Sequence, residues 1–155
     1  LMPIGMLVVL DSILNRITQN RAKGKHTFIF IDEIYLLFQH EYSANFLFTL
    51  WKRVRKYGAY ASGITQNVDD LLQSHTARTM LANSEFIIML NQASTDRTEL
   101  AKLLNISDLQ LSYITNVDAG HGLIKVGSSL VPFANKFPKN TKLYKLMTTK
   151  PGENL

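Results

Sequence analysis

Apolar residues near the start of the chain recur at the spacing of an amphipathic helix over residues 4–22, and Gly24 follows as a helix-stop residue. Residues 27–31, Thr-Phe-Ile-Phe-Ile, are a continuous apolar run without the alternation of a half-exposed strand. Such a run is typical of a strand covered on both faces, as in a parallel α/β sheet. The next amphipathic pattern, over residues 43–57, predicts a second helix that ends at Gly58.

The remainder of the chain alternates between predicted strands and predicted helices. Further strands are expected at 59–65 and 85–90. Helices are expected at 68–72, 75–82 and 141–147. A further helix is expected to run to Leu104 from a cap at Ser94, Thr95 or Asp96, and another to begin at the S-x-x-Q capping box of Ser107. Residues 122–126 and 130–133 flank a Gly-Ser-Ser turn and predict a β-hairpin. The pattern predicts a single α/β domain over residues 1–155, with a mainly parallel sheet flanked by helices and a C-terminal β-hairpin.

Composition narrows the function classes without choosing one. The chain has 155 residues, 46% hydrophobic and 19% charged, which suffices for one packed domain. A net charge of +5 permits an anionic partner such as a nucleotide, a nucleic acid or a lipid headgroup. The lack of cysteine excludes disulfides, thiolate zinc sites and cysteine nucleophiles. The apolar stretch 4–10 is too short to span a bilayer and has no basic signal-peptide region, so we expect a cytoplasmic globular protein.

The sharpest candidate site is the acidic pair that follows the first apolar strand. Asp32 and Glu33 leave the carboxyl end of residues 27–31, which is where open α/β sheets bind ligands. Asp32 can hold Mg²⁺ beside the phosphates of a nucleotide, and Glu33 can orient and deprotonate an attacking water. The alternative interpretation is that the pair is only an acidic cap for the turn that follows.

Gln66 stands at the end of the next predicted strand, after Thr65. A glutamine amide can donate to a phosphate or a water and accept from the same water, which suits a sensor of the γ-phosphate. Alternatively, Gln66 and Asn67 only begin a loop, with Asn67 capping the next helix. The conjunction with the acidic pair favours the first interpretation, because two successive strands then end in polar groups able to meet one phosphate.

Four cations lie within residues 52–56, Lys-Arg-Val-Arg-Lys. The end of a helix favours cations, so a solvated face is one explanation. The functional alternative is that Arg53 or Arg55 is an arginine finger offered to the phosphates of a neighbouring subunit. The four histidines have no metal-ligand spacing, and no G-x-S-x-G nucleophile motif occurs.

Together these residues resemble the conjugative-transfer ATPases of type IV secretion systems, in the FtsK- and HerA-like branch of RecA-type P-loop motors. The resemblance runs from about residue 4 to the end of the chain. Its motifs are Asp32-Glu33, Arg55-Lys56, Thr65-Gln66, Asp69-Asp70, the strand 86–90, Gly120-His121-Gly122 and Thr148-Thr149-Lys150-Pro151. It implies a partial RecA-like fold, with Asp32 as the Walker B magnesium ligand, Glu33 as the catalytic base and Gln66 as the sensor. Arg55 is the better finger candidate, and Arg53 the second.

The resemblance also implies cofactors, partners and a location. ATP and Mg²⁺ are expected in the full-length protein, which would form a homo-oligomer, in this family a hexamer. Its expected partners are the channel and coupling proteins of the secretion system, and DNA is a further candidate. The location implied is the cytoplasm, at the inner face of the cell membrane, with peripheral membrane association.

The phosphate-binding loop of this family is missing from the sequence. No G-x-x-x-x-G-K-[ST] occurs, and residues 22–27 lack the first glycine and the Lys-Ser/Thr order. Because the chain also starts at Leu1 in mid-pattern, we expect the C-terminal piece of a longer ATPase, itself inactive and without bound nucleotide. Without the P-loop strand, the piece is expected to self-associate, to have been released by proteolysis, or to pair Ile64 and Ile88 on neighbouring strands.

Two other functions fit the same motifs. One is a DNA-translocating coupling protein or helicase of the same superfamily, which should add a basic, sequence-independent DNA surface. The other is a non-enzymatic α/β interaction domain in which Asp32 and Glu33 only cap a turn.

Overall fold

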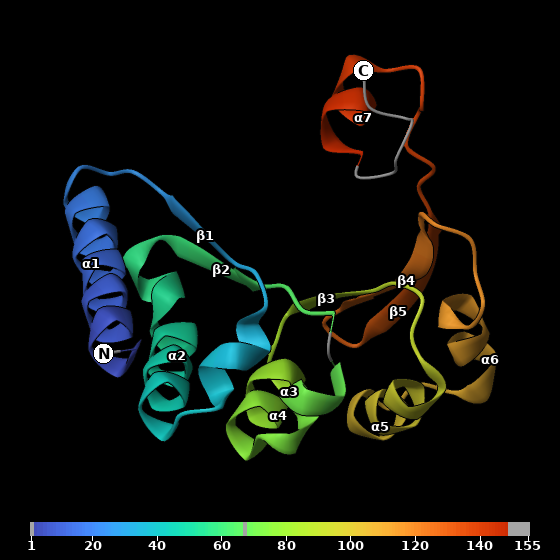
Figure 1. Cartoon of the computed structure of the whole chain (residues 1–155), viewed down its shortest axis with the longest axis horizontal. Helices are drawn as coiled ribbons and strands as arrows, with labels where there is room; N and C mark the ends of the chain where they lie inside the picture. Colours follow the sequence, from blue (N-terminus) through green and yellow to red (C-terminus); the bar gives the residue numbers. More distant parts are fainter. Residues whose placement is uncertain (1, 67, 149–155) are drawn as a thin grey trace. The chain divides into compact units, whose positions relative to one another are not determined.

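The structure, a computed structural model, describes residues 2–66 and 68–148 (Figure 1). The chain divides into two compact units, residues 1–83 and 84–155, and the single domain expected from the sequence stays a prediction. Both units combine helices with a small sheet, so the predicted α/β class is confirmed. No helix within the described ranges is long and apolar enough to cross a membrane.

The first unit contains a parallel pair of strands and a set of helices. Its elements are α1 (Met2–Ala22), β1 (Thr27–Ile31), the 3-10 helix η1 (Ile34–Phe38), α2 (Glu41–Arg53), the 3-10 helix η2 (Val54–Tyr57), β2 (Ala59–Gly63), α3 (Val68–Gln73) and α4 (His75–Ala82). The helix expected at 43–57 is thus α2 followed by one 3-10 turn. Gly58 ends it as predicted, because its left-handed backbone (φ 65°) is one that glycine adopts without strain.

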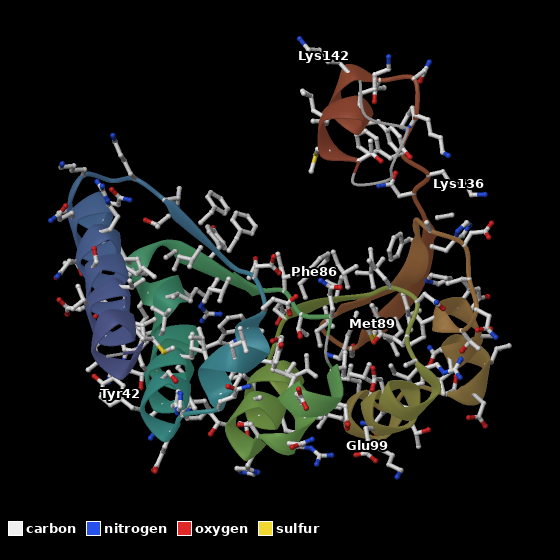
Figure 2. The ribbon with its side chains drawn as sticks, viewed as in Figure 1. Tyr42, Phe86, Met89, Glu99, Lys136 and Lys142 are labelled. Carbon is white, nitrogen blue, oxygen red and sulfur yellow. The ribbon has the colours of Figure 1, made fainter. Side chains whose placement is uncertain are left out.

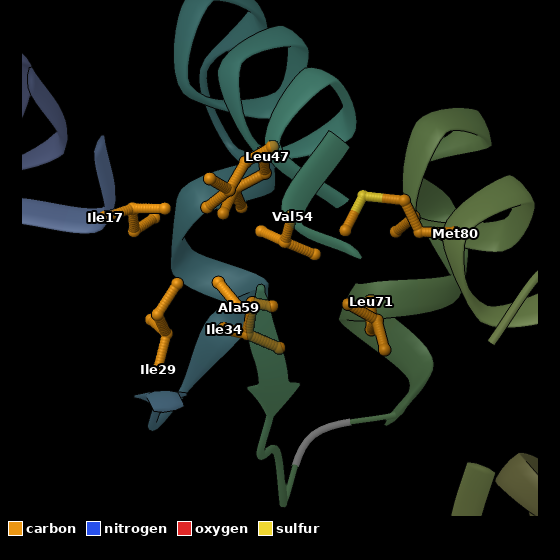
Figure 3. Close-up of a cluster of buried hydrophobic side chains, with 10 residues drawn as sticks. Ile17, Ile29, Ile34, Leu47, Val54, Ala59, Leu71 and Met80 are labelled. Carbon is orange, nitrogen blue, oxygen red and sulfur yellow. The ribbon is translucent and has the colours of Figure 1, made fainter. Parts of the chain in front are cut away.

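A hydrophobic core covers one face of the β1–β2 pair (Figure 3). Every helical element of this unit contributes to it. The buried residues of the cluster are Ile17, Ile29, Ile34, Leu47, Leu50, Val54, Ala59, Leu71, Ala77 and Met80. Burial of these apolar side chains holds the two strands in a fixed position against the helices, which fixes the place where the strands end.

The opposite face of the same strands corrects the expectation that residues 27–31 are covered on both faces. Ile29 is buried, but its neighbours Phe28 and Phe30 are 65% and 70% exposed. Tyr60 on β2 is exposed with them. Successive side chains of a strand point to opposite faces, so the helices of this unit bury only the odd-numbered set of β1. We call Phe28, Phe30 and Tyr60 the aromatic face.

The second unit is built on a three-stranded antiparallel sheet in the order β3-β4-β5. Its elements are β3 (Phe86–Met89), α5 (Ser94–Leu104), α6 (Asp108–Leu111), the 3-10 helix η3 (Ser112–Ile114), β4 (His121–Val126), β5 (Ser129–Ala134) and α7 (Lys142–Met147). The predicted hairpin is confirmed as β4–β5. β3 also has a covered and an open face, since Met89 is buried and Phe86 exposed (Figure 2).

The strand partners differ from one of the outcomes expected for a piece without its P-loop strand. β2 pairs with β1, and β3 pairs with β4, so Ile64 and Ile88 do not lie on paired strands within the described ranges. Ile88 instead lies opposite Ile124 in the antiparallel β3–β4 pair.

The helix caps were predicted with mixed success. The Ser107 capping box is present, with both reciprocal hydrogen bonds to Gln110. The helix expected to be capped by Ser94, Thr95 or Asp96 instead includes all three residues and has Ala93 at its N-cap position. Residues 67 and 149–151, to which the sequence assigned a cap and a family motif, lie outside the described residues.

Candidate functional site

The candidate site lies where β1 and β2 end side by side. Because the strands are parallel, with Ile31 opposite Gly63, their carboxyl ends meet at one edge of the sheet. Two backbone hydrogen bonds extend the pairing: Ile64 donates to the Ile31 carbonyl at 2.8 Å, and Ile34 donates to the Ile64 carbonyl at 3.0 Å. These bonds place the residues after each strand at the same edge.

Glu33 and Gln66 are in direct contact at this edge. The Gln66 Nε2 donates a hydrogen bond to the Glu33 Oε1 at 3.1 Å. Glu33 is half-buried, whereas Gln66 is exposed. A carboxylate beside an amide offers both a proton acceptor and a hydrogen-bonding group for a water or a phosphate, which are the parts that general-base hydrolysis needs. The structure thus brings together two of the predicted site residues, and their chemical roles stay predictions.

Asp32 stands beside this pair and is exposed. Its Oδ1 accepts a hydrogen bond from the backbone N–H of Glu33 at 2.9 Å, which holds the carboxylate at the start of the turn. Within the described ranges, no group of three or more His, Cys, Asp or Glu side chains is placed to hold a metal by itself. Asp32 nevertheless fits Mg²⁺, since this ion commonly takes one or two carboxylates and completes its shell with water and substrate phosphates.

The backbone of Glu33 is in the left-handed region, with φ 48° and ψ 45°. This conformation is uncommon outside glycine, asparagine and aspartate, and costs about 1–3 kcal/mol at a residue such as glutamate. Sharp turning at this position sends the chain from β1 directly into η1 and leaves the Glu33 side chain at the strand edge. The residue type gives no signal of this turn, so sequence reasoning missed it.

Gly63 is a residue of the site that sequence reasoning missed. A Cβ at this position would lie 2.6 Å from Cδ1 and 3.3 Å from Cγ2 of Ile34. Ile34 is only 5% exposed and follows Glu33 directly, so it packs against Gly63 right beside the turn that carries the glutamate. A glycine as the last strand residue before Ile-Thr-Gln is the signal that was available.

The two candidate arginines do not lie at this edge. Arg53 ends α2 and lines a cavity of about 520 Å³ with residues of α1 and α2, among them Leu14 and Phe46. Arg55 lies in η2, and both arginines are exposed. η2 leads into the amino end of β2, while Gln66 follows its carboxyl end, and a strand of this length spans about 16 Å at about 3.3 Å per residue. The structure therefore does not bring either arginine to the Glu33–Gln66 pair.

The other family-like motifs have structural settings. Asp69 and Asp70 occupy the first turn of α3, where carboxylates are favourable to the helix dipole. Gly120 has φ 86°, and its backbone carbonyl accepts a hydrogen bond from the Asn135 N–H at 2.6 Å, at the open end of the β4–β5 hairpin. These positions support the fold of their own units.

Comparison with known proteins identifies the chain's relatives. The TraG P-loop domain family matches residues 1–125, which is most of the chain. The solved structure of VirB4 of Thermoanaerobacter pseudethanolicus is similar, with a TM-score of 0.75, 26% sequence identity and 84% of this chain covered. The chain spans 36% of the length of that VirB4 chain. No curated protein matches significantly. The family resemblance seen in the motifs is confirmed, and the chain belongs to the TraG P-loop domain family.

Proposed function

We propose that this chain is the C-terminal portion of an ATP-hydrolysing motor that powers conjugative transfer through a type IV secretion apparatus. Membership of the TraG P-loop domain family and similarity to VirB4 support a motor of this class. The proposal includes a homo-oligomer, in this class a hexamer, at the cytoplasmic face of the membrane, with channel and coupling proteins as partners. A P-loop from outside these 155 residues would complete the nucleotide site, so the piece alone would not hydrolyse ATP.

The observation that carries the proposal is the contact between Glu33 and Gln66 at the carboxyl ends of adjacent parallel strands, at 3.1 Å. In α/β sheets this edge is where phosphates bind. The proposed roles are Glu33 as the base that takes a proton from the attacking water, Gln66 as a contact to the γ-phosphate, and Asp32 as the Mg²⁺ ligand. Bound Mg²⁺ would neutralise charge on the phosphates.

The proposed reaction balances at these residues. As the water oxygen bonds to the γ-phosphorus, the bond to the β–γ bridging oxygen breaks and ADP leaves with that electron pair. One water proton passes to the Glu33 carboxylate, and the other stays on the new phosphate. Glu33 then returns its proton to solvent. This is possible because the side chain is only half-buried at the sheet edge.

The test is ATP hydrolysis by the full-length protein that contains this chain, in its assembled form. Glu33→Gln keeps the size of the side chain and removes the base, so kcat should fall by at least about 100-fold while nucleotide binding persists. Glu41→Gln is the matched control, because Glu41 is an exposed glutamate in the first turn of α2. Wild-type hydrolysis by Glu33→Gln would instead favour an interaction domain without enzymatic activity.

A cluster of cations favours a second candidate, a DNA-translocating member of the same superfamily. The cationic cluster consists of Arg21, Lys23, Lys25, Arg55 and Lys56, all exposed. The two segments that carry it lie close together, because the Arg21 guanidinium lies 5.1 Å from the Tyr57 ring centroid and the Thr27 N–H donates to the Gly58 carbonyl. DNA binding that weakens steeply with salt, together with DNA-stimulated hydrolysis, would support this candidate.

A further inference from the structure

The Gln66 amide has two N–H donors and one carbonyl acceptor, and one of the donors is engaged by the Glu33 Oε1 at 3.1 Å. We propose that Gln66 is the positioning residue of Glu33, whose carboxylate it holds in the orientation that accepts the proton of the attacking water. This inference rests on the proposed function, and it assigns Gln66 an action through the Glu33 side chain in place of a γ-phosphate contact.

Glu33 needs such a restraint. A glutamate side chain has several rotatable bonds and is only half-buried here, so it samples many orientations unless a partner restricts it. Both ends of the restraint are themselves anchored. The Ile34-to-Ile64 and Ile64-to-Ile31 backbone hydrogen bonds fix the turn after β1 and the segment that leads to Gln66. One side-chain hydrogen bond therefore joins two parts of the backbone that are already in register.

The remaining groups of the pair are complementary to one water molecule. With Oε1 of Glu33 occupied by the amide, the second carboxylate oxygen and the Gln66 carbonyl oxygen are two acceptors on neighbouring side chains. A water that donates one proton to each acceptor presents its lone pair away from them, toward an electrophile at the strand edge. Fixed orientation of a nucleophile in this way is worth orders of magnitude in rate.

Positioning and direct phosphate sensing predict different kinetics. A sensor that touches only phosphate acts whether or not Glu33 is a base, and its loss changes the relative affinity for ATP and ADP. A positioning residue acts through Glu33, so its loss lowers kcat with little change in KM, and the effect disappears once Glu33 is no longer a base.

A double-mutant cycle on the assembled full-length protein separates the two. Gln66→Met keeps the length of the side chain and removes its amide. In the wild-type background we expect kcat to fall by about 10- to 100-fold with KM unchanged. In the Glu33→Gln background the same change should alter the residual rate by less than about twofold. Affinities for fluorescent ATP and ADP analogues should stay as in wild type. Gln73→Met, at an exposed glutamine of α3, is the control for the substitution itself.

Each contrary result has a distinct meaning. An equal loss of rate from Gln66→Met in both backgrounds, or a selective loss of ATP-analogue binding, overturns the positioning role and leaves direct sensing. Unchanged kcat in Gln66→Met overturns it as well. Wild-type hydrolysis by the Glu33→Gln protein overturns the proposed function and this inference together. Because Gln66 is exposed, unfolding temperatures equal to wild type should accompany every variant.

Discussion

Phe28 and Tyr60 lie directly opposite each other in the β1–β2 register, and their rings stack with centroids 5.0 Å apart and an interplanar angle of 14°. Phe30 lies on the same side of β1, two residues further along. Monomeric proteins seldom leave a continuous apolar patch of this kind in water. Contact with another surface would therefore remove apolar area of the aromatic face from water.

We expect the isolated 155-residue chain to self-associate through the aromatic face, and Phe30→Thr to weaken that association. Threonine suits an exposed strand position, and the change leaves the Phe28–Tyr60 stack intact, so the free energy of unfolding should move by less than about 1 kcal/mol. Sedimentation velocity over a range of concentrations measures the effect. Val9→Thr, which replaces an exposed apolar residue of α1 by the same polar residue, should associate like wild type. Equal association of both variants would place the contact elsewhere.

Gly63→Ala should destabilise the first unit. The new methyl group would meet Ile34, which is buried and cannot move outward freely, so we expect a loss of about 1–3 kcal/mol in the free energy of unfolding. Chemical denaturation measures it. Gly5→Ala is the matched control, since nothing lies within 4 Å of its Cβ and alanine is favoured over glycine in a helix by about 1 kcal/mol. We expect Gly63→Ala to lower the free energy of unfolding and Gly5→Ala to raise it. An unchanged free energy of unfolding for Gly63→Ala would contradict the tight packing.

Local sequence patterns predicted most of the elements, because their signals are local. The helix at 75–82 and the strand at 27–31 have the predicted bounds, and Gly58 ends its helix. The covering of β1 could not be predicted in the same way. A run of five apolar residues is equally compatible with one or two buried faces, and the outcome depends on what other segments cover it.

The candidate site was predictable only in outline. Parallel pairing of two strands implies that their following residues share an edge, so a meeting of Glu33 with Gln66 follows from topology. Topology did not predict which carboxylate Gln66 contacts. Gln66 donates to Glu33, while Asp32 accepts a hydrogen bond from the backbone of its own turn. Glu33 also has a left-handed backbone beside the buried Ile34, and its residue type does not signal that conformation.

Ser107→Ala should weaken the second unit by about 1 kcal/mol, within the range of about 0.5–2 for lost N-caps. The Ser107 hydroxyl accepts from the Gln110 N–H, and the Gln110 side chain accepts from the Ser107 N–H at 3.0 Å. Without the hydroxyl, the backbone N–H of Gln110 has only water to accept its hydrogen bond. Amide hydrogen exchange at residues 108–111 measures the opening directly. Ser128→Ala, in the β4–β5 turn, is the control, and it should change the free energy of opening at residues 108–111 by less than about 0.5 kcal/mol.

We expect Arg55 to act on the phosphates of a neighbouring subunit. Arg55→Ala should lower hydrolysis by the assembled full-length protein by about 10³-fold or more, the scale of other arginine fingers. Arg16→Ala, which removes the same charge from an exposed position on α1, should hydrolyse ATP like wild type. Mixing inactive Arg55→Ala subunits with inactive Glu33→Gln subunits should restore part of the rate, because some interfaces then contain both intact residues. Absence of recovery would contradict an action between subunits.

The left-handed turn at Glu33 bears both on the stability of the backbone and on the proposed chemistry of the side chain. Glycine or asparagine would relax the main chain there, and either would delete the carboxylate at this site. With Glu33 as the proposed base, a replacement that relaxes the backbone here also removes the group that takes the proton, so we expect stabilising substitutions at this position to lower hydrolysis.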